Sequence, residues 1–95
     1  LIDMALQTGV AAGTMVRSSH IGRLGEYNEQ AAAAGLVSII TVNTHGATRR
    51  VAPPGGKAPR IGTNPLAIGV PAEGGPLCLD FGTSATAEGK VRVKK

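Results

Sequence analysis

The chain has 95 residues, of which 42% are hydrophobic and 17% are charged, and this composition is typical of a folded globular domain rather than of a disordered chain. Ten Lys and Arg residues against six Asp and Glu give a formal net charge of +4, which suits an anionic ligand. Tyr27 and Phe81 are the only aromatic residues and no apolar run approaches the roughly 20 residues of a membrane helix, so we expect neither a nucleic-acid nor a membrane partner.

The chain opens with a predicted helix and strand. Leu1 and Met4 share one face of a helix over residues 1–8, and Gly9 is a plausible stop for it. Residues 10–16 are then predicted to form a strand.

A second amphipathic helix is predicted after this strand. Ser18 or Ser19 can cap its N-terminus, and Gly35 ends it. Its apolar side chains recur at spacings of three and four residues and are Ile21, Leu24, Tyr27, Ala31 and Ala34.

The second half of the chain predicts three strands and a long loop. Residues 36–42 form a nearly unbroken apolar run, which is typical of a strand covered on both faces. Residues 43–65 hold four of the six prolines and four basic residues, and they predict a loop of a length that is often functional. Residues 66–70 and 77–81 predict two strands joined by a turn at residues 73–75. This order of elements favours an α/β fold with a mixed sheet.

The ends of the chain indicate whether it is part of a longer protein, and its single cysteine indicates the cellular compartment. The chain begins at Leu1 rather than at Met and stops inside a basic run, so we interpret it as a piece of a longer protein, truncated at both ends. Because no linker or internal repeat divides residues 1–95, we expect them to belong to one domain. Cys78 has no partner for an internal disulfide, which favours a reducing, cytoplasmic setting.

His20 is the sharpest candidate for chemistry, since it lies between the predicted strand and the second helix. Imidazole exchanges a proton near neutral pH, and oxidation of an alcohol by hydride transfer requires such an exchange. A capping or surface histidine would suit the same position, so the residue alone leaves both interpretations open.

Two later segments carry polar groups at the ends of predicted strands. Residues 60–65 read RIGTNP, and residues 79–84 read LDFGTS. The first can face a ligand or form an ordinary turn, and the second can bind ribose or amide groups or cap the next element.

Several common sites are excluded. The chain contains no G-x-G-x-x-G, so it has no Rossmann fingerprint. Residues 82–90 have six rather than four residues between their glycines, and Val91 replaces the Ser or Thr of a P-loop. His20 and His45 are the only histidines and neither has a carboxylate at a recognised spacing, so we expect no metal site.

Four segments in order resemble the malate/L-lactate dehydrogenase family, which includes ureidoglycolate, sulfolactate and other 2-hydroxycarboxylate dehydrogenases. They are SSHIGRLGEY at 18–27, AAAAGLVSI at 31–39, VAPPGGKAPRIGTNPLAIGVP at 51–71 and LDFGTSATAEGKVRV at 79–93. The resemblance implies part of a mixed-sheet, non-Rossmann NAD(P)-binding domain. It also implies an oxidoreductase that transfers hydride between NAD or NADP and a 2-hydroxy acid such as malate or lactate, and that is a homodimer.

The resemblance also implies roles for individual residues. His20 matches the catalytic proton donor and acceptor. Positions that match contacts to the dinucleotide are Gly22, Arg23, Leu24, Thr44, Cys78, Leu79, Asp80, Phe81 and Gly82. Thr63 and Asn64 match the wall near the nicotinamide and the substrate.

The chain also departs from the family. Pro54 stands where members often have phenylalanine, and His45 and Arg49 lie in a variable loop and receive no role. The family's amino-terminal His and Arg, which help to bind the substrate carboxylate, are absent, and so is its carboxy-terminal half, so we expect the isolated piece to be inactive. The rival interpretation is a non-catalytic binding or assembly module; His20 together with the GTNP segment favours the enzyme.

Overall fold

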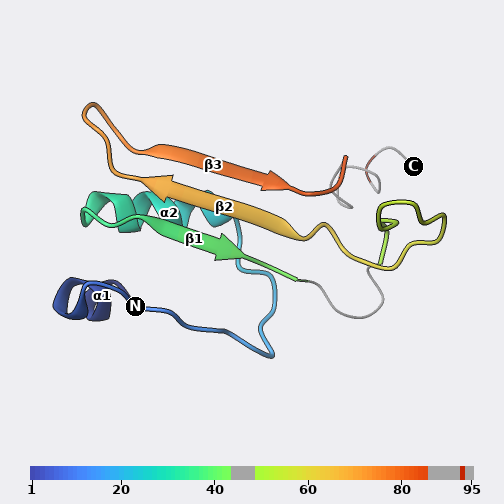
Figure 1. Cartoon of the computed structure of the whole chain (residues 1–95), viewed down its shortest axis with the longest axis horizontal. Coiled ribbons are helices and arrows are strands. Elements are labelled where there is room, and N and C mark those ends of the chain that lie inside the picture. The colour runs from blue at the N-terminus through green and yellow to red at the C-terminus, as the bar shows by residue number, and fades with distance from the viewer. Residues whose placement is uncertain (44–48, 86–92, 94–95) are drawn as a thin grey trace. The chain divides into compact units, whose positions relative to one another are not determined.

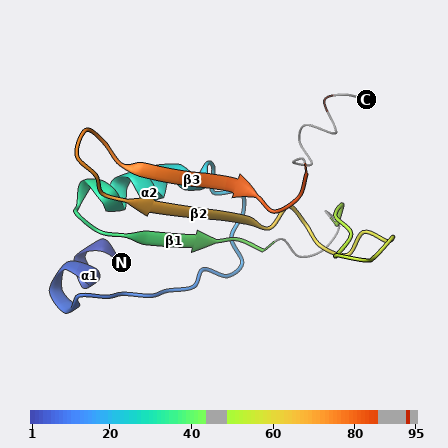
Figure 2. The same ribbon diagram turned by 45° about the horizontal axis from the view of Figure 1, so that its top comes forward.

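The computed structural model describes residues 1–43, 49–85 and 93. The elements of this part of the chain are α1 (Ile2–Thr8), α2 (Leu24–Ala33), β1 (Ser38–Thr41), β2 (Pro65–Val70) and β3 (Leu77–Gly82) (Figure 1). The strands form one sheet in the order β1-β2-β3, and β2 runs opposite to both of its neighbours (Figure 2). The described strands are therefore antiparallel, and the predicted mixed sheet is not seen among them, because the chain reverses direction between successive strands.

The chain divides into two compact units. Unit 1 comprises Leu1–Ile40 and Ala67–Leu79, and unit 2 comprises Thr41–Leu66 and Asp80–Lys95. The chain passes from one unit to the other within each of the three strands. The single domain that we expect for residues 1–95 stays a prediction.

The first predicted helix is confirmed as α1, and Gly9 ends it in the left-handed conformation, with φ of 86°. The strand predicted over residues 10–16 is wrong. No described strand pairs with this segment, and Val10 and Val16 are 78% and 77% exposed. An apolar run without a hydrogen-bonding neighbour cannot form a ladder, so this segment stays irregular.

The second predicted helix is confirmed as α2, but its start and its buried face differ from the prediction. The cap position is Arg23 rather than a serine, and it makes no side-chain capping bond. The buried positions include Asn28 in place of Tyr27, which is 42% exposed. With the helix starting at Leu24, the buried face runs through Leu24, Asn28, Ala31 and Ala32.

Asn28 is the point at which α2 packs on the sheet. Its side chain is fully buried, and its amide donates to the backbone oxygen of Ser38 at 3.2 Å and to the Ser38 hydroxyl at 2.7 Å. A Cβ atom at Gly69 would lie 2.7 Å from the Asn28 Cβ, so only glycine lets β2 approach the helix this closely. These contacts hold α2 against the sheet.

The strands in the second half of the chain are confirmed with small shifts of their ends. The first is β1, which alternates half-buried and exposed residues instead of being covered on both faces, and Ile39 is 68% exposed. The turn at residues 73–75 joins β2 to β3, with Gly74 at φ of 82°. No helix in the described ranges is long and apolar enough to span a membrane.

The described part of the predicted loop contains a short hairpin. Val51 and Ile61 form an antiparallel bridge at its base. Near its tip the Gly56 N–H donates to the Pro53 oxygen at 2.8 Å, and Gly55 takes φ of 75°. The loop is therefore partly ordered by backbone hydrogen bonds, which its composition did not predict.

Candidate functional site

The residues that the sequence singles out are distributed over both units. Unit 1 holds His20, Gly22, Arg23, Leu24, Cys78 and Leu79, and unit 2 holds Thr63, Asn64, Asp80, Phe81 and Gly82. Thr44 lies outside the described residues.

His20 lies in the loop before α2, exposed to solvent, and its orientation is set by a backbone contact. The Gly22 N–H donates to the His20 Nδ1 at 3.1 Å. Because a neutral imidazole has one donor and one acceptor nitrogen, this bond leaves the proton on Nε2. Gly22 reaches the contact with φ of 85°, a conformation that residues with a Cβ rarely adopt.

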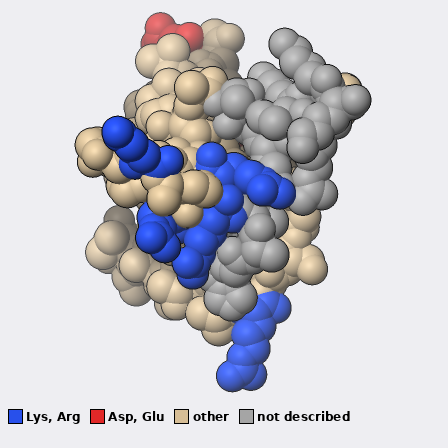
Figure 3. Space-filling view, turned by 90° about the vertical axis from the view of Figure 1, so that its right-hand side faces the viewer, with Lys and Arg blue, Asp and Glu red and all other residues tan. Residues whose placement is uncertain are grey.

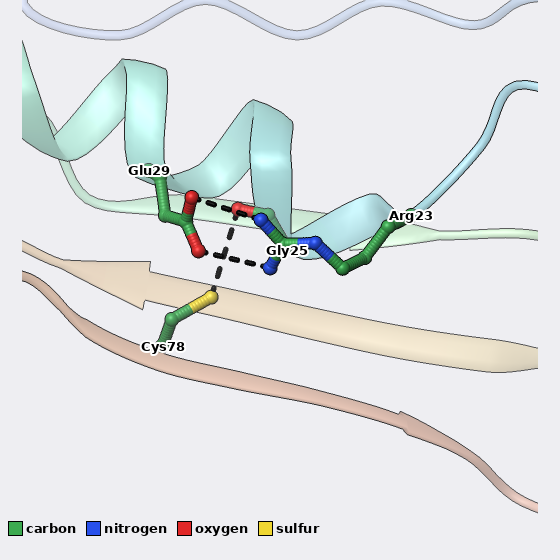
Figure 4. A network of polar contacts seen from close by, with 4 residues as sticks. All are labelled: Arg23, Gly25, Glu29 and Cys78. Carbon is green, nitrogen blue, oxygen red and sulfur yellow. Dashed lines mark hydrogen bonds and ion pairs between the residues drawn. The ribbon is translucent and has the colours of Figure 1, made fainter.

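Arg23 follows at the cap of α2 and is held by a two-pronged ion pair. Its Nη1 and Nη2 atoms donate to the two carboxylate oxygens of Glu29, each at 2.9 Å (Figure 4). This hydrogen bonding and the charge of its partner raise the pKa of Arg23 and lower the pKa of Glu29. The guanidinium stays partly exposed, so it is oriented without being shielded from an anionic ligand.

Leu24 and Cys78 connect this loop to the core. The side chain of Leu24 is buried, with 5% of the residue exposed, so it serves packing and leaves only its backbone for a ligand. The Cys78 thiol of β3 donates to the Gly25 oxygen with an Sγ–O distance of 3.7 Å (Figure 4). The segments around residues 22–24 and 78 therefore meet within unit 1.

In unit 2 the two other predicted segments also meet. The Thr83 N–H donates to the Thr63 oxygen at 3.1 Å, and the Thr83 hydroxyl lies 3.2 Å from that oxygen and 3.0 Å from the Asn64 oxygen. A Cβ atom at Gly82 would lie 2.6 Å from the Thr63 Cγ2. The absence of a side chain at Gly82 thus allows the GTNP segment to lie against the end of β3.

A solvent-open groove of about 470 Å³ lies next to this contact. Asn64, at φ of 43°, lines it, and its Oδ1 atom is buried with no hydrogen-bond partner among the described residues. A buried amide oxygen without a partner is costly, and a turn of the Asn64 side chain toward the groove would let this oxygen accept from a ligand N–H. The lining carries no charged side chain and comprises Thr41, Val42, Asn43, Ile61, Asn64, Pro65, Leu66 and Thr83.

Several of these contacts involve residues that sequence reasoning missed. Glu29 lies six residues from Arg23, outside the usual helical pair spacings, so no sequence signal marks it. Thr83 stands within the LDFGTS segment, whose pattern does not single it out. No sequence pattern marks the groove residues at the end of β1 and directly after it, which are Thr41 to Asn43.

The described ranges contain no group of three or more His, Cys, Asp or Glu residues that could hold a metal ion. Unit 1 offers an exposed imidazole and an oriented guanidinium, and unit 2 offers hydroxyls and amides. These groups can exchange a proton and bind a ligand that combines neutral rings with anionic groups.

Comparison with known proteins gives one family along the whole chain. Residues 1–95 match the family model described as malate/L-lactate dehydrogenase. Hydroxycarboxylate dehydrogenase B of Escherichia coli strain K12 is 48% identical over 93 residues, which cover 97% of this chain and 26% of that protein. L-lactate dehydrogenase of Cupriavidus necator is 44% identical over 94 residues, covering 97% of this chain and 27% of that protein.

A solved structure of an Escherichia coli protein assigned to the malate/lactate dehydrogenases is similar as well. It has a TM-score of 0.83 and 47% sequence identity, over 97% of this chain and 26% of that chain. The chain therefore spans about a quarter of the length of the relatives that it matches. Since the family model covers every residue, the resemblance seen in the sequence is confirmed, and the chain belongs to the malate/L-lactate dehydrogenase family.

Proposed function

We propose that the protein containing this chain is an oxidoreductase that transfers hydride between NAD or NADP and a 2-hydroxycarboxylic acid, such as malate or lactate. The observation that carries the proposal is the match of all 95 residues to the malate/L-lactate dehydrogenase family. The names of two relatives, a hydroxycarboxylate dehydrogenase and an L-lactate dehydrogenase, support the same substrate class.

His20 exchanges the substrate proton in this proposal. In oxidation the hydroxyl oxygen loses its proton to His20 as the carbon loses hydride, and in reduction His20 returns a proton to the new alkoxide oxygen. In the observed arrangement Nδ1 accepts from Gly22, so Nε2 carries the proton of the neutral ring. To accept a proton at Nε2 the ring must carry its own proton on Nδ1, and the bond to Gly22 then has to open.

The chain's own residues fit a dinucleotide. When bound, the nicotinamide ring supplies or accepts the hydride. The unpartnered Oδ1 of Asn64 matches a carboxamide or amino N–H, and the uncharged groove suits a neutral ring. In this proposal Gly22–Leu24, Thr44 and Cys78–Gly82 hold the dinucleotide, and Thr63 and Asn64 form the wall near nicotinamide and substrate.

The domain type, the cellular location and the oligomeric state of the protein are proposed together with its activity. We assign residues 1–95 to one NAD(P)-binding domain of mixed-sheet, non-Rossmann type, which other parts of the protein complete. The protein is a cytoplasmic homodimer that takes small 2-hydroxy and 2-oxo acids rather than nucleic acids. The exposed apolar side chains of Leu77, Leu79 and Phe81 on β3 are consistent with further protein covering this strand.

A substrate screen tests the proposal. The intact protein is mixed with NADH or NADPH and a panel of 2-oxo acids that includes pyruvate and oxaloacetate, and loss of absorbance of the reduced cofactor is followed. We expect turnover with at least one 2-oxo acid and none with acetone, which has the carbonyl but lacks the carboxylate. Binding of the dinucleotide without turnover of any 2-oxo acid would instead favour the binding-module interpretation.

A further inference from the structure

The guanidinium of Arg23 is held in a defined place and orientation by Glu29. Exposed cations are common on this chain, and Figure 3 shows Lys and Arg side chains on its surface, so positive charge alone does not mark a binding position. Arg23 has a defined orientation as well, because both of its terminal nitrogen atoms donate to the Glu29 carboxylate at 2.9 Å. Two parallel hydrogen bonds between a planar guanidinium and a planar carboxylate leave little freedom to either group. Glu29 therefore determines where this positive charge stands.

The pair lies where two segments that are proposed to hold the dinucleotide meet. Arg23 stands at the cap of α2, and its side chain reaches along the helix to Glu29, six residues further on. At the start of this helix the Gly25 oxygen accepts from the Cys78 thiol of β3 (Figure 4). The hydrogen bond from Glu29 is the largest of the influences that raise the pKa of Arg23, and Cys78 is near enough to add to it. Glu29 thus draws the guanidinium toward the junction of residues 22–24 with Cys78.

The pair leaves one edge of the guanidinium for another acceptor. A guanidinium has five N–H donors in a fixed plane, and Glu29 takes one from each terminal nitrogen. The Nε–H and the outer N–H of Nη2 point the same way along a second edge. The Arg23 side chain is 57% exposed, so a ligand can reach this edge. Two parallel N–H donors match two oxygens of a phosphate group.

Binding explains this arrangement better than fold stability does. Exposed ion pairs contribute little to stability, because water screens them and because two long side chains lose their freedom. An arginine that is already held does not have to be ordered when a ligand binds, so the same loss of freedom favours binding. The charge of Glu29 opposes an anionic ligand, but the carboxylate occupies a different edge of the guanidinium and is 42% exposed, so the repulsion is screened as well.

We propose that Glu29 is a positioning residue that holds Arg23 so that the free edge of its guanidinium binds the diphosphate of the dinucleotide. This role rests on the proposed function, in which Arg23 contacts the dinucleotide, and neither the family resemblance nor that function assigns a role to Glu29. The diphosphate is favoured over the substrate carboxylate because Arg23 and Cys78, which are near each other here, both belong to segments that are proposed to hold the dinucleotide.

Binding measurements on the intact protein test this role. The variant is Glu29→Gln, which keeps the shape of the side chain and removes its charge. NADH is titrated by cofactor fluorescence, and ADP-ribose, which contains the diphosphate but no nicotinamide, is titrated by calorimetry. We expect the Kd of both ligands to rise about three- to tenfold. With NADH at saturation, kcat and the KM for the 2-oxo acid should stay within about twofold, because the substrate carboxylate binds elsewhere.

Glu26→Gln is the matched control. Glu26 is exposed in the first turn of the same helix, and its charge also reaches Arg23. Removing this charge leaves the bonds from Glu29 in place, so the Kd of NADH should stay the same or fall slightly. A rise equal to that of Glu29→Gln would mean that negative charge on α2, rather than the orientation of Arg23, supports binding. Urea unfolding checks that both variants are as stable as the parent protein.

A double-mutant cycle shows whether Glu29 acts through Arg23. Arg23→Gln should raise the Kd of NADH by itself, because the cation that contacts the ligand is lost. Adding Glu29→Gln to Arg23→Gln should then change the Kd by less than about twofold, since no guanidinium remains to be held. Independent, additive effects of the two substitutions would mean that Glu29 acts by another route and would contradict the proposed role.

Other outcomes separate this role from the proposed function. An unchanged or lower Kd of NADH and ADP-ribose in Glu29→Gln would overturn the positioning role, and turnover of a 2-oxo acid by the same protein would leave the proposed function standing. A raised KM for the 2-oxo acid at an unchanged Kd of NADH would instead assign the pair to the substrate carboxylate. Raised Kd values without turnover of any 2-oxo acid would reject only the activity. A protein that binds neither NADH nor ADP-ribose would reject both.

Discussion

Substituting Gly69 by alanine should separate α2 from β2. The added Cβ would lie 2.7 Å from the Asn28 Cβ and 3.0 Å from the Asn28 oxygen, whereas non-bonded carbon atoms normally sit about 3.5–4.0 Å apart. The helix would therefore have to withdraw by roughly 1 Å. Overpacking of this kind costs about 1–3 kcal/mol, and weakening the bonds from Asn28 to Ser38 adds about 0.5–1.5 kcal/mol. We expect a total loss of about 2–4 kcal/mol in the free energy of unfolding.

Urea unfolding of the intact protein measures this loss as a lower midpoint at an unchanged m value. The matched control is Gly13→Ala, whose Cβ would meet only the exposed, rotatable side chain of Leu1 at 3.2 Å. We expect the control to change the free energy by less than about 0.5 kcal/mol. If both variants unfold at the same midpoint, the close approach of α2 to β2 does not have the structural role assigned to it.

Two further predictions concern the loop before α2. Gly22→Ala should strain a backbone at φ of 85° and lower the free energy of unfolding of the intact protein by about 1–2 kcal/mol, which urea unfolding measures; an unchanged midpoint would contradict the left-handed conformation of Gly22. Arg23→Gln should raise the pKa of Glu29 toward its ordinary value in an NMR titration, because the arginine lowers this pKa in the folded state. In the unsubstituted protein the pair therefore stabilises the fold at neutral pH, and this effect is lost as the pH falls through the lowered pKa of Glu29. An identical titration of Glu29 in the variant would show that the pair does not form in solution.

Local patterns predicted the helices and three of the strands because the sequence carries their periods and their stops. Gly9 and the glycines of the β2–β3 turn adopt left-handed backbone conformations, as glycine at such positions suggests. The strand expected at residues 10–16 failed for a non-local reason. A strand needs a neighbour, and composition says nothing about which segments lie side by side.

The buried face of α2 shows the same limit. Tyr27 fits an apolar stripe by spacing, but Asn28 takes the buried position because Ser38 satisfies its amide and Gly69 makes room for it. Neither partner is close in sequence. A glycine inside the predicted strand at residues 66–70 was the one available sign of a close backbone approach.

The candidate site was found by an ordered series of motifs rather than by geometry. The sequence resemblance led to His20 and the GTNP segment, and the structure adds the contacts that orient them, from Gly22 to the imidazole and from Thr83 to the GTNP backbone. The Arg23–Glu29 pair and the Val51–Ile61 bridge join residues six and ten positions apart, at spacings that no helix or strand period marks.

The central claim is that His20 exchanges the substrate proton, and steady-state turnover of His20→Ala in the intact protein tests it most directly. With a 2-oxo acid and reduced cofactor at saturation, the account predicts that kcat falls by about two to four orders of magnitude. Dinucleotide affinity should stay within about twofold of the parent protein's value, as expected for a group that acts on the proton rather than on binding. A variant with near-normal kcat would remove His20 from the mechanism.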